Sequence, residues 1–204
     1  MEPLIPKDLC TRCGACFAAD TKNFLAEDEK GFPILRKRNV DEERRLKRVC
    51  TGHNWNYREL LDYVHGSEHP YDPSSPDAGK IRQVRIAWAS DPTLRSRGQS
   101  GGISISLLRA GFELDAIDSA LAVARRRRSD GYNPFAAIPF IARTESDLIE
   151  AAGSKYAICP SLKLIREIHD KSERFAATLL PCQTAGLYQL MRTELPNLSE
   201  KLKF

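Results

Sequence analysis

Three cysteines within seven residues constrain the fold of this chain more than any other feature. Cys10, Cys13 and Cys16 are each separated by two residues in the stretch "LCTRCGACFAAD", with Gly14 inside the run. A tight loop of this kind turns successive thiolates toward one point, where an iron–sulfur cluster can be held with its sulfides close to backbone amides. The next cysteine along the chain is Cys50, so we expect it to supply the fourth ligand.

The spacing indicates an iron–sulfur cluster rather than zinc. Zinc sites typically combine two separated Cys-x-x-Cys pairs, or one such pair with two histidines, and this chain has no second pair. Bacterial ferredoxins have the same triplet followed by a cysteine before proline, and Asp20 and Thr21 occupy that place here. Three alternatives stay open: His53 in place of Cys50, a zinc ion, and four unbound thiols. The predicted ligands of one four-iron, four-sulfur (4Fe–4S) cluster are Cys10, Cys13, Cys16 and Cys50.

Composition indicates a globular protein of the cytoplasm. The chain is 42% hydrophobic and 28% charged, which excludes a disordered protein. No stretch approaches the roughly 18 consecutive apolar residues of a membrane span, and the first ten residues lack the pattern of a secretory signal. Six cysteines then favour metal or redox chemistry over disulfides, because the cytoplasm keeps thiols reduced.

The charge of the chain gives little reason to expect nucleic-acid binding. The formal net charge is only +4, and the run "RRRR" at 125–128 is typical of a solvated loop. A zinc-stapled nucleic-acid-binding module is therefore a disfavoured alternative.

The chain divides into three parts by composition. Residues 1–70 carry four of the six cysteines and show little periodicity, which predicts a small ferredoxin-like iron–sulfur module. Residues 71–80 lie in the stretch "GSEHPYDPSSPDAGK", whose Pro, Ser and Gly predict a linker. Residues 81–204 are predicted to form an α/β domain, of mixed α+β sheet type, that binds flavin and is incomplete.

Strand and helix signals alternate through this last part, which favours an α/β fold with a mixed sheet. Thr144 is the predicted N-cap of one helix, with Asp147 at its capping-box position and Gly153 as its stop. The predicted strands are 83–90, 116–124, 136–142 and 174–180. The predicted helices are one opened by Ser100, Gly101 and Gly102, and those over 144–153, 161–170 and 182–195.

The last residues, "LSEKLKF", resemble the start of another buried strand that is not completed. A frayed tail is the alternative. We interpret the chain as a fragment or a split subunit, whose sheet is finished by further residues or by another polypeptide.

Three loops between strands and helices have the composition of ligand-binding loops. The first, "RGQSGGISISLL" at 97–108, places a Ser-Gly-Gly turn before a helix, where exposed amides suit a phosphate. The others are "AGSKYAICPS" at 152–161 and "LPCQTAG" at 180–186, and each combines small residues with a cysteine. Because ligands gather at the carboxyl ends of strands in α/β sheets, these loops can converge on one cleft.

Four motifs in this order resemble the family of coenzyme F-420 hydrogenase and dehydrogenase beta subunits. They are "CTRCGAC", "DPTLRSRGQSGGISISLL", "IARTESDLIEAAGSKY" and "LPCQTAGLYQL", and the resemblance extends from Leu9 to Phe204. It implies an iron–sulfur N-terminal module, an α/β domain that binds FAD, and hydride exchange between flavin and the deazaflavin coenzyme or another substrate.

The resemblance also implies which residues hold the flavin. Those that would contact FAD are Ser100, Gly101, Gly102, Gly153, Ser154, Lys155 and Tyr156, with Cys182 and Gln183 close to it. Reasoning from the residues alone leaves alternatives: Lys155 as a surface lysine, Tyr156 packed beside a strand, and Cys159 and Cys182 as buried small side chains or as ligands of a second cluster.

The resulting hypothesis is an iron–sulfur flavoprotein oxidoreductase that passes electrons between a 4Fe–4S cluster and FAD, with hydride transfer to or from coenzyme F-420 or a related substrate. Expected partners are a redox partner protein or ferredoxin, a small-molecule hydride donor or acceptor, and a complementary subunit or a second copy of the chain. The alternative is a noncatalytic electron-transfer or assembly subunit, or an inactive fragment, that binds only the cluster.

Overall fold

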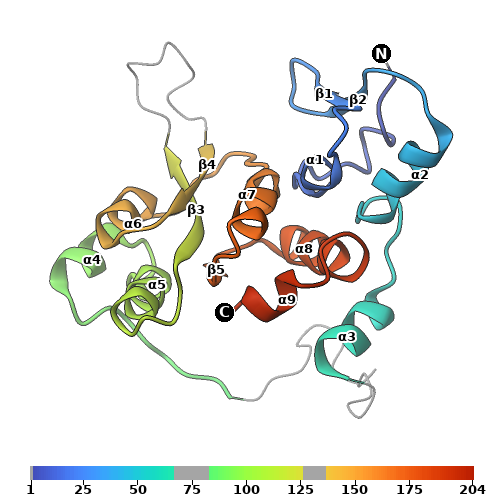
Figure 1. Ribbon diagram of the computed structural model, residues 1–204. Coiled ribbons are helices and arrows are strands. Elements are labelled where there is room, and N and C mark those ends of the chain that lie inside the picture. Colours follow the sequence, from blue (N-terminus) through green and yellow to red (C-terminus); the bar gives the residue numbers. More distant parts are fainter. Residues whose placement is uncertain (1, 67–82, 126–136) are drawn as a thin grey trace.

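The computed structural model describes residues 2–66, 83–125 and 137–204 (Figure 1). The predicted linker at 71–80 and most of the arginine run lie outside these ranges. Among the described helices, none has the length and apolar character needed to cross a bilayer.

The N-terminal part is built from short elements. Their bounds are α1 Ala15–Ala19, β1 Leu25–Glu27, β2 Pro33–Leu35, α2 Val40–Arg48 and α3 Tyr57–His65. Strands β1 and β2 pair antiparallel as a hairpin. Asn39 and Asn56 begin α2 and α3, because each side-chain oxygen accepts a hydrogen bond from the backbone N–H three residues ahead.

A three-stranded mixed sheet forms the centre of the rest of the chain, as predicted. Its strands are β3 Ser119–Arg125, β4 Ala137–Ala142 and β5 Phe175–Ala177. In the order β4-β3-β5, β3 runs antiparallel to β4 and parallel to β5. All three strands fall within stretches that the sequence assigned to strands.

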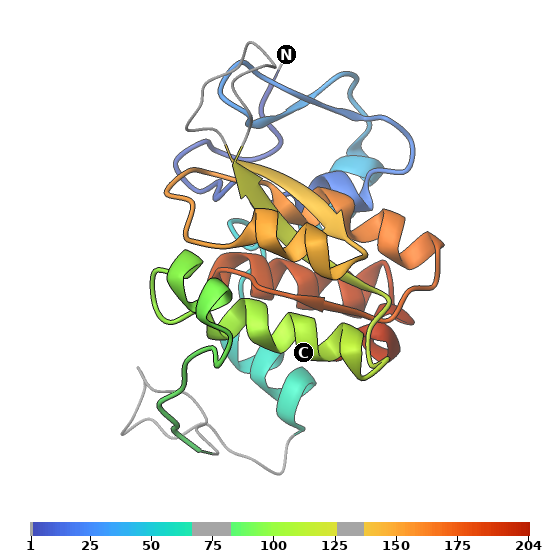
Figure 2. The same cartoon turned by 90° about the vertical axis from the view of Figure 1, so that its left-hand side faces the viewer.

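Helices cover both faces of this sheet (Figures 1 and 2). On one side are α4 Pro92–Arg97, α5 Ile103–Glu113 and α6 Glu145–Ala151. On the other are the 3₁₀ helix η2 Ser161–Leu164, α7 Ile165–Asp170, α8 Pro181–Thr193 and α9 Leu198–Lys201. The capping box between Thr144 and Asp147 is confirmed at the start of α6.

Two predicted strands are wrong. Residues 83–90 are not in a strand, although their apolar side chains alternate, because this segment has no neighbouring strand among the described residues. Residues 198–201 form the helical turn α9, because Leu198 and Leu202 are four positions apart and both pack on the core in that conformation. Only Leu202 reaches the sheet, in a single parallel bridge to Phe175.

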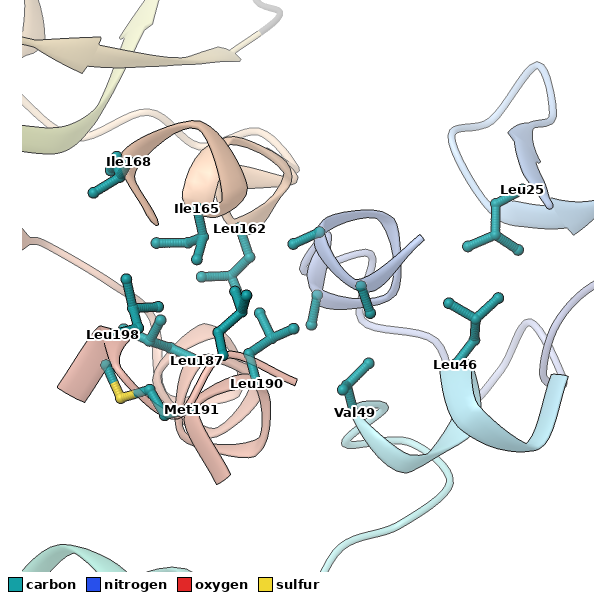
Figure 3. Close-up of a cluster of buried hydrophobic side chains, with 14 of the residues drawn as sticks. Leu25, Leu46, Val49, Leu162, Ile165, Ile168, Leu187, Leu190, Met191 and Leu198 are labelled. Atoms are coloured by element: carbon teal, nitrogen blue, oxygen red, sulfur yellow. The ribbon is translucent and has the colours of Figure 1, made fainter. Parts of the chain in front are cut away.

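The larger core cluster joins segments that are far apart in sequence. Figure 3 shows Leu46 and Val49 approaching from α2 and its end, and Leu162, Leu187 and Leu190 approaching from η2 and α8, with α1 between them. The apolar side chains of the N-terminal part therefore pack into a core that they share with α7 and α8. The domain limits predicted above remain a prediction.

Candidate thiol site and flavin loops

The structure brings the four predicted cluster ligands to one cavity. Cys50 reaches it from the turn after α2, and the other three thiols come from the loop before α1 and its first turn. The residues that line the cavity include Leu4, Ile5, Cys10, Thr11, Arg12, Cys13, Gly14, Cys16, Cys50, Thr51 and Pro160. His53 is exposed and is not one of these lining residues.

Two glycines let the backbone close around this cavity. Gly14 has φ of +95°, and a Cβ there would lie 2.7 Å from the carbonyl oxygen of Pro160. A Cβ on Gly52 would lie 2.2 Å from the carbonyl oxygen of Leu9. Both positions exclude a side chain, so the thiol loops can be in direct backbone contact with their neighbours.

Burial determines the electrostatics of the four thiols. Desolvation raises the pKa of Cys16 well above its ordinary value, and neighbouring thiols add to this effect. The pKa of Cys50 rises to about 11, and those of Cys10 and Cys13 are also raised, again mainly by burial. Thiols of this kind become thiolates when a cation at the site stabilises the negative charge.

The donor set fits an iron–sulfur cluster. Four thiols around a cavity with backbone amides nearby are the ligands that such a cluster takes. Within the described ranges, no three His, Cys, Asp or Glu side chains are grouped as ligands of a single metal ion.

Arginines hold α1 in place beside the cavity. Arg45 of α2 donates to the carbonyl oxygen of Ala19 at 3.0 Å and also binds Glu42 and Glu194. Arg166 of α7 donates to the preceding carbonyl, that of Ala18, at 2.6 Å. Since carbonyls at the end of a helix lack helical partners, these bonds fix the helix that carries Cys16.

Two of the predicted flavin loops meet. The N–H of Ser154 donates to the side-chain oxygen of Gln99 at 3.0 Å, which joins the loop after α6 to the glycine turn before α5. In that turn Gly101 and Gly102 both have positive φ, at +81° and +72°, and Gly102 is the N-cap of α5. The predicted glycine turn is therefore confirmed as the start of this helix.

The next two residues of the second loop differ in their surroundings. The ammonium group of Lys155 donates to the carbonyl oxygens of Ala151 and Ala152 at the end of α6. Burial, followed by repulsion from Arg125, lowers the pKa of Lys155. Tyr156 is 91% exposed, so it is not packed beside a strand.

The third loop lies beside the thiol cavity. Gln183 donates through its amide nitrogen to the carbonyl oxygen of Cys159 at 2.9 Å, and the N–H of Leu180 donates back to its amide oxygen. Cys182 is close enough to Cys13 to help raise the pKa of that thiol. The loop that carries Cys159 therefore touches the glycine turn through Ser154 at one end and the thiol site at the other.

Sequence reasoning missed the part of α8 that faces the thiols. A Cβ on Gly186 would lie 3.5 Å from the sulfur of Cys13 and 2.9 Å from a methyl of Leu162, so the helix approaches the cavity because it has no side chain there. Gln189, one turn further on, donates to the carbonyl oxygen of Asn54 in the turn that follows Cys50. No spacing signal in the sequence points to either residue.

Comparison with known proteins connects these observations to a family. Residues 84–166 match the family model described as "Coenzyme F420 hydrogenase/dehydrogenase, beta subunit N-term". The chain is 29% identical over 204 residues to a subunit of the F(420)H(2) dehydrogenase of Methanosarcina mazei, which covers 98% of this chain and 52% of that protein. It is 26% identical over 191 residues to the coenzyme F420-dependent sulfite reductase of Methanocaldococcus jannaschii, with 93% of this chain and 26% of that protein covered.

A solved structure shares the fold. It is the F420-reducing [NiFe] hydrogenase complex from Methanosarcina barkeri, one chain of which matches with a TM-score of 0.51 and 21% identity, over 57% of this chain and 40% of that one. The chain spans between about a quarter and about half of the length of the curated relatives it matches.

These matches confirm the resemblance inferred from the four motifs. The proteins that share this chain's sequence pattern are named as subunits or enzymes of coenzyme F420 oxidoreduction. Within that class, the chain resembles the family of coenzyme F420 hydrogenase/dehydrogenase beta subunits, whose N-terminal model covers residues 84–166.

Proposed function

We propose that this protein transfers electrons between a 4Fe–4S cluster and FAD, as part of an oxidoreductase that exchanges hydride with coenzyme F420 or a related substrate. The observation that carries the proposal is that four thiols line one cavity whose wall includes Pro160, a residue of a predicted flavin loop. A one-electron carrier and a flavin would thus be held by neighbouring segments of one chain.

The arrangement of the thiols supports a cluster over a single ion. A cubane of iron and sulfide is larger than one metal ion, so its thiolates are farther apart than the ligands of zinc. The four cysteines line a common cavity and yet, among the described residues, form no single-ion group. In the proposed site they hold the cluster, and Gly14 and Gly52 allow the backbone to close around it.

The proposed flavin site is formed by the two loops that meet at Gln99 and Ser154. Their glycines expose backbone amides at the N-terminus of α5, an 11-residue helix whose positive end suits a phosphate. Tyr156 offers an exposed ring, and Lys155 a cation, on the same loop. Flavin, when bound, couples two-electron hydride chemistry to one-electron chemistry, and the chain orients it relative to the thiol site.

Partners and location belong to the same proposal. Several relatives are named as subunits, which supports the presence of a complementary subunit here as well. We propose that the protein acts in the cytoplasm with such a subunit and with a redox partner protein or ferredoxin.

The second candidate is an electron-transfer or assembly subunit that binds the cluster alone. Two features favour it: Tyr156 is almost fully exposed, and Lys155 is bound to the end of α6 instead of pointing to an open anion site. The thiol site is complete among the described residues, whereas the flavin loops are open.

Anaerobic purification followed by iron, sulfide and flavin analysis tests the proposal. We expect about four iron and four sulfide per chain, with flavin bound at once or on addition of FAD. Cys50→Ser should lose the cluster, while Cys159→Ser, which alters a thiol that is not among the cavity-lining residues, should keep it. A protein with iron and sulfide that never binds FAD supports the second candidate, and a protein without iron overturns both.

A further inference from the structure

We propose that Gln189 of α8 is a positioning residue for Cys50, holding the distant arm of the thiol site in register with the other three cysteines. The inference rests on the proposed function, because it assigns Gln189 a role in assembling the proposed cluster site. It concerns a residue that touches neither thiol nor cofactor and acts through the turn that follows Cys50.

A short series of hydrogen bonds connects Gln189 to Cys50. The amide nitrogen of Gln189 donates to the carbonyl oxygen of Asn54 at 2.9 Å. The N–H of Asn54 donates to the carbonyl oxygen of Cys50 at 2.8 Å, and the N–H of His53 donates to the same oxygen at 3.1 Å. The turn that presents Cys50 is thus closed on itself and attached to α8 at one point.

The surroundings of Gln189 make this attachment the reason for an amide at that position. The residue is 1% exposed, and the neighbouring buried positions Leu187, Leu190 and Met191 are apolar. Its amide oxygen is buried without a hydrogen-bond partner in the part of the chain that the structure describes. Burying a polar group in this way is unfavourable unless a specific bond offsets the cost, and the bond to Asn54 is that bond.

The same helix also contacts the other arm of the site. Gly186 precedes Gln189 by three positions, so both lie on one face of α8. The contact of Gly186 with Cys13 and the bond of Gln189 to the Cys50 turn therefore refer both arms to one rigid element of 13 residues. Cys13 and Cys50 are 37 positions apart in sequence, and α8 sets their separation.

The test compares Gln189→Met with Thr193→Val. Methionine keeps the length and apolar stem of the side chain but cannot donate to Asn54. Thr193 lies one turn later on the same helix, and its hydroxyl donates to the backbone of Gln189, so Thr193→Val removes a side-chain bond without detaching the Cys50 turn. Gln189→His is the rescue variant, because the ring Nε2 lies about as far from the backbone as the glutamine amide nitrogen and can donate.

The first readout needs no iron. The cluster-free chain is alkylated briefly, and labelling at each cysteine is measured by mass spectrometry. We expect Gln189→Met to speed labelling of Cys50 at least threefold while Cys159 is unchanged, Thr193→Val to behave as the unaltered chain, and Gln189→His to restore slow labelling. Unchanged labelling of Cys50, or an equal rise at both cysteines, overturns the proposal.

The second readout uses the reconstituted protein. We expect chelator-driven loss of iron to be severalfold faster in Gln189→Met than in Thr193→Val, with an altered electron paramagnetic resonance spectrum of the reduced cluster. Equal rates and spectra would count against a positioning role. If no variant takes up iron, the proposed function fails, while the labelling comparison still decides the inference.

Discussion

The thiol site and the flavin loops of this protein are built in opposite ways. The thiol site is enclosed: its loops contact η2 and α8, and its helix α1 is bound by arginines from two other helices. The flavin loops, residues 97–102 and 152–158, are held together by one side-chain bond and carry exposed apolar residues such as Tyr156 and Ile158.

The difference shows which site the chain can form by itself. A cavity whose walls belong to the hydrophobic core keeps its shape before any ligand arrives, so little conformational entropy is lost when a cluster assembles. Loops with exposed apolar side chains still have surface to cover, and a bound flavin or a partner would cover it. The cluster should therefore bind independently of flavin, and flavin binding should depend on more than the described residues.

The largest expected effect is loss of the cluster on changing one thiol. Cys16→Ser should reduce bound iron and sulfide to a small fraction of the unaltered amount, because the buried hydroxyl replaces a thiolate ligand. Lys155→Ala, in the flavin loops, should leave iron unchanged. If both variants lose iron equally, the two sites are not independent. Iron analysis after anaerobic purification measures this.

Glycine substitutions compare the tightness of the two regions. Gly14→Ala combines a φ of +95° with a contact of 2.7 Å to Pro160, so we expect a loss of about 3 kcal/mol in the free energy of unfolding. Gly153→Ala has a similar φ of +81° but its nearest atom is 3.4 Å away, and about 1 kcal/mol should be lost. Denaturant unfolding of the cluster-free chain measures both, and equal losses would contradict the comparison.

The arginine that binds α1 should contribute to stability. Arg45→Ala leaves the carbonyl of Ala19 and the carboxylate of Glu194 without this donor, and we expect unfolding to be easier by about 2 kcal/mol. Arg44→Ala, whose exposed pair with Asp41 contributes little, should change stability by less than about 0.5 kcal/mol. Thermal unfolding distinguishes them, and equal stabilities would show that Arg45 does not fix α1.

An aromatic substitution addresses the open loops. Tyr156→Ala should leave the melting temperature unchanged, because the ring is exposed, and weaken FAD binding about fivefold, because a stacking contact of about 1 kcal/mol is lost. Leu114→Ala is the control, an exposed apolar change at the far end of α5. Flavin fluorescence titration measures the affinity, and equal affinities would remove Tyr156 from the proposed site.

The smallest expected effect concerns acid stability of the sheet that supports the loops. Hydrogen bonds from Arg174 lower the pKa of Asp118 to about 2 from 3.8. The stabilising contribution is therefore complete above about pH 4 and is lost as the pH falls toward 2. Asp118→Asn should show a shallower fall of melting temperature across that range, and parallel curves would argue against this pair.

Local patterns were sufficient for much of the fold and for part of the site. The capping box of Thr144, the glycine turn before α5 and all three strands of the mixed sheet follow from neighbouring residues, because capping and turn chemistry act within a few positions. The triplet spacing likewise predicted a common cavity for its thiols. The strand predicted at 83–90 failed, because alternation identifies a face but does not supply a neighbouring strand.

The sequence by itself determined which thiols belong together: three by their spacing and Cys50 because it is the next cysteine along the chain. Only the tertiary structure decided what holds them together, namely a core shared with η2 and α8, the close approach at Gly186 and the bond from Gln189. The physical reason is that spacing acts along a few residues of backbone, whereas the fit of a helix against a loop 135 positions away depends on the packing of every side chain between them.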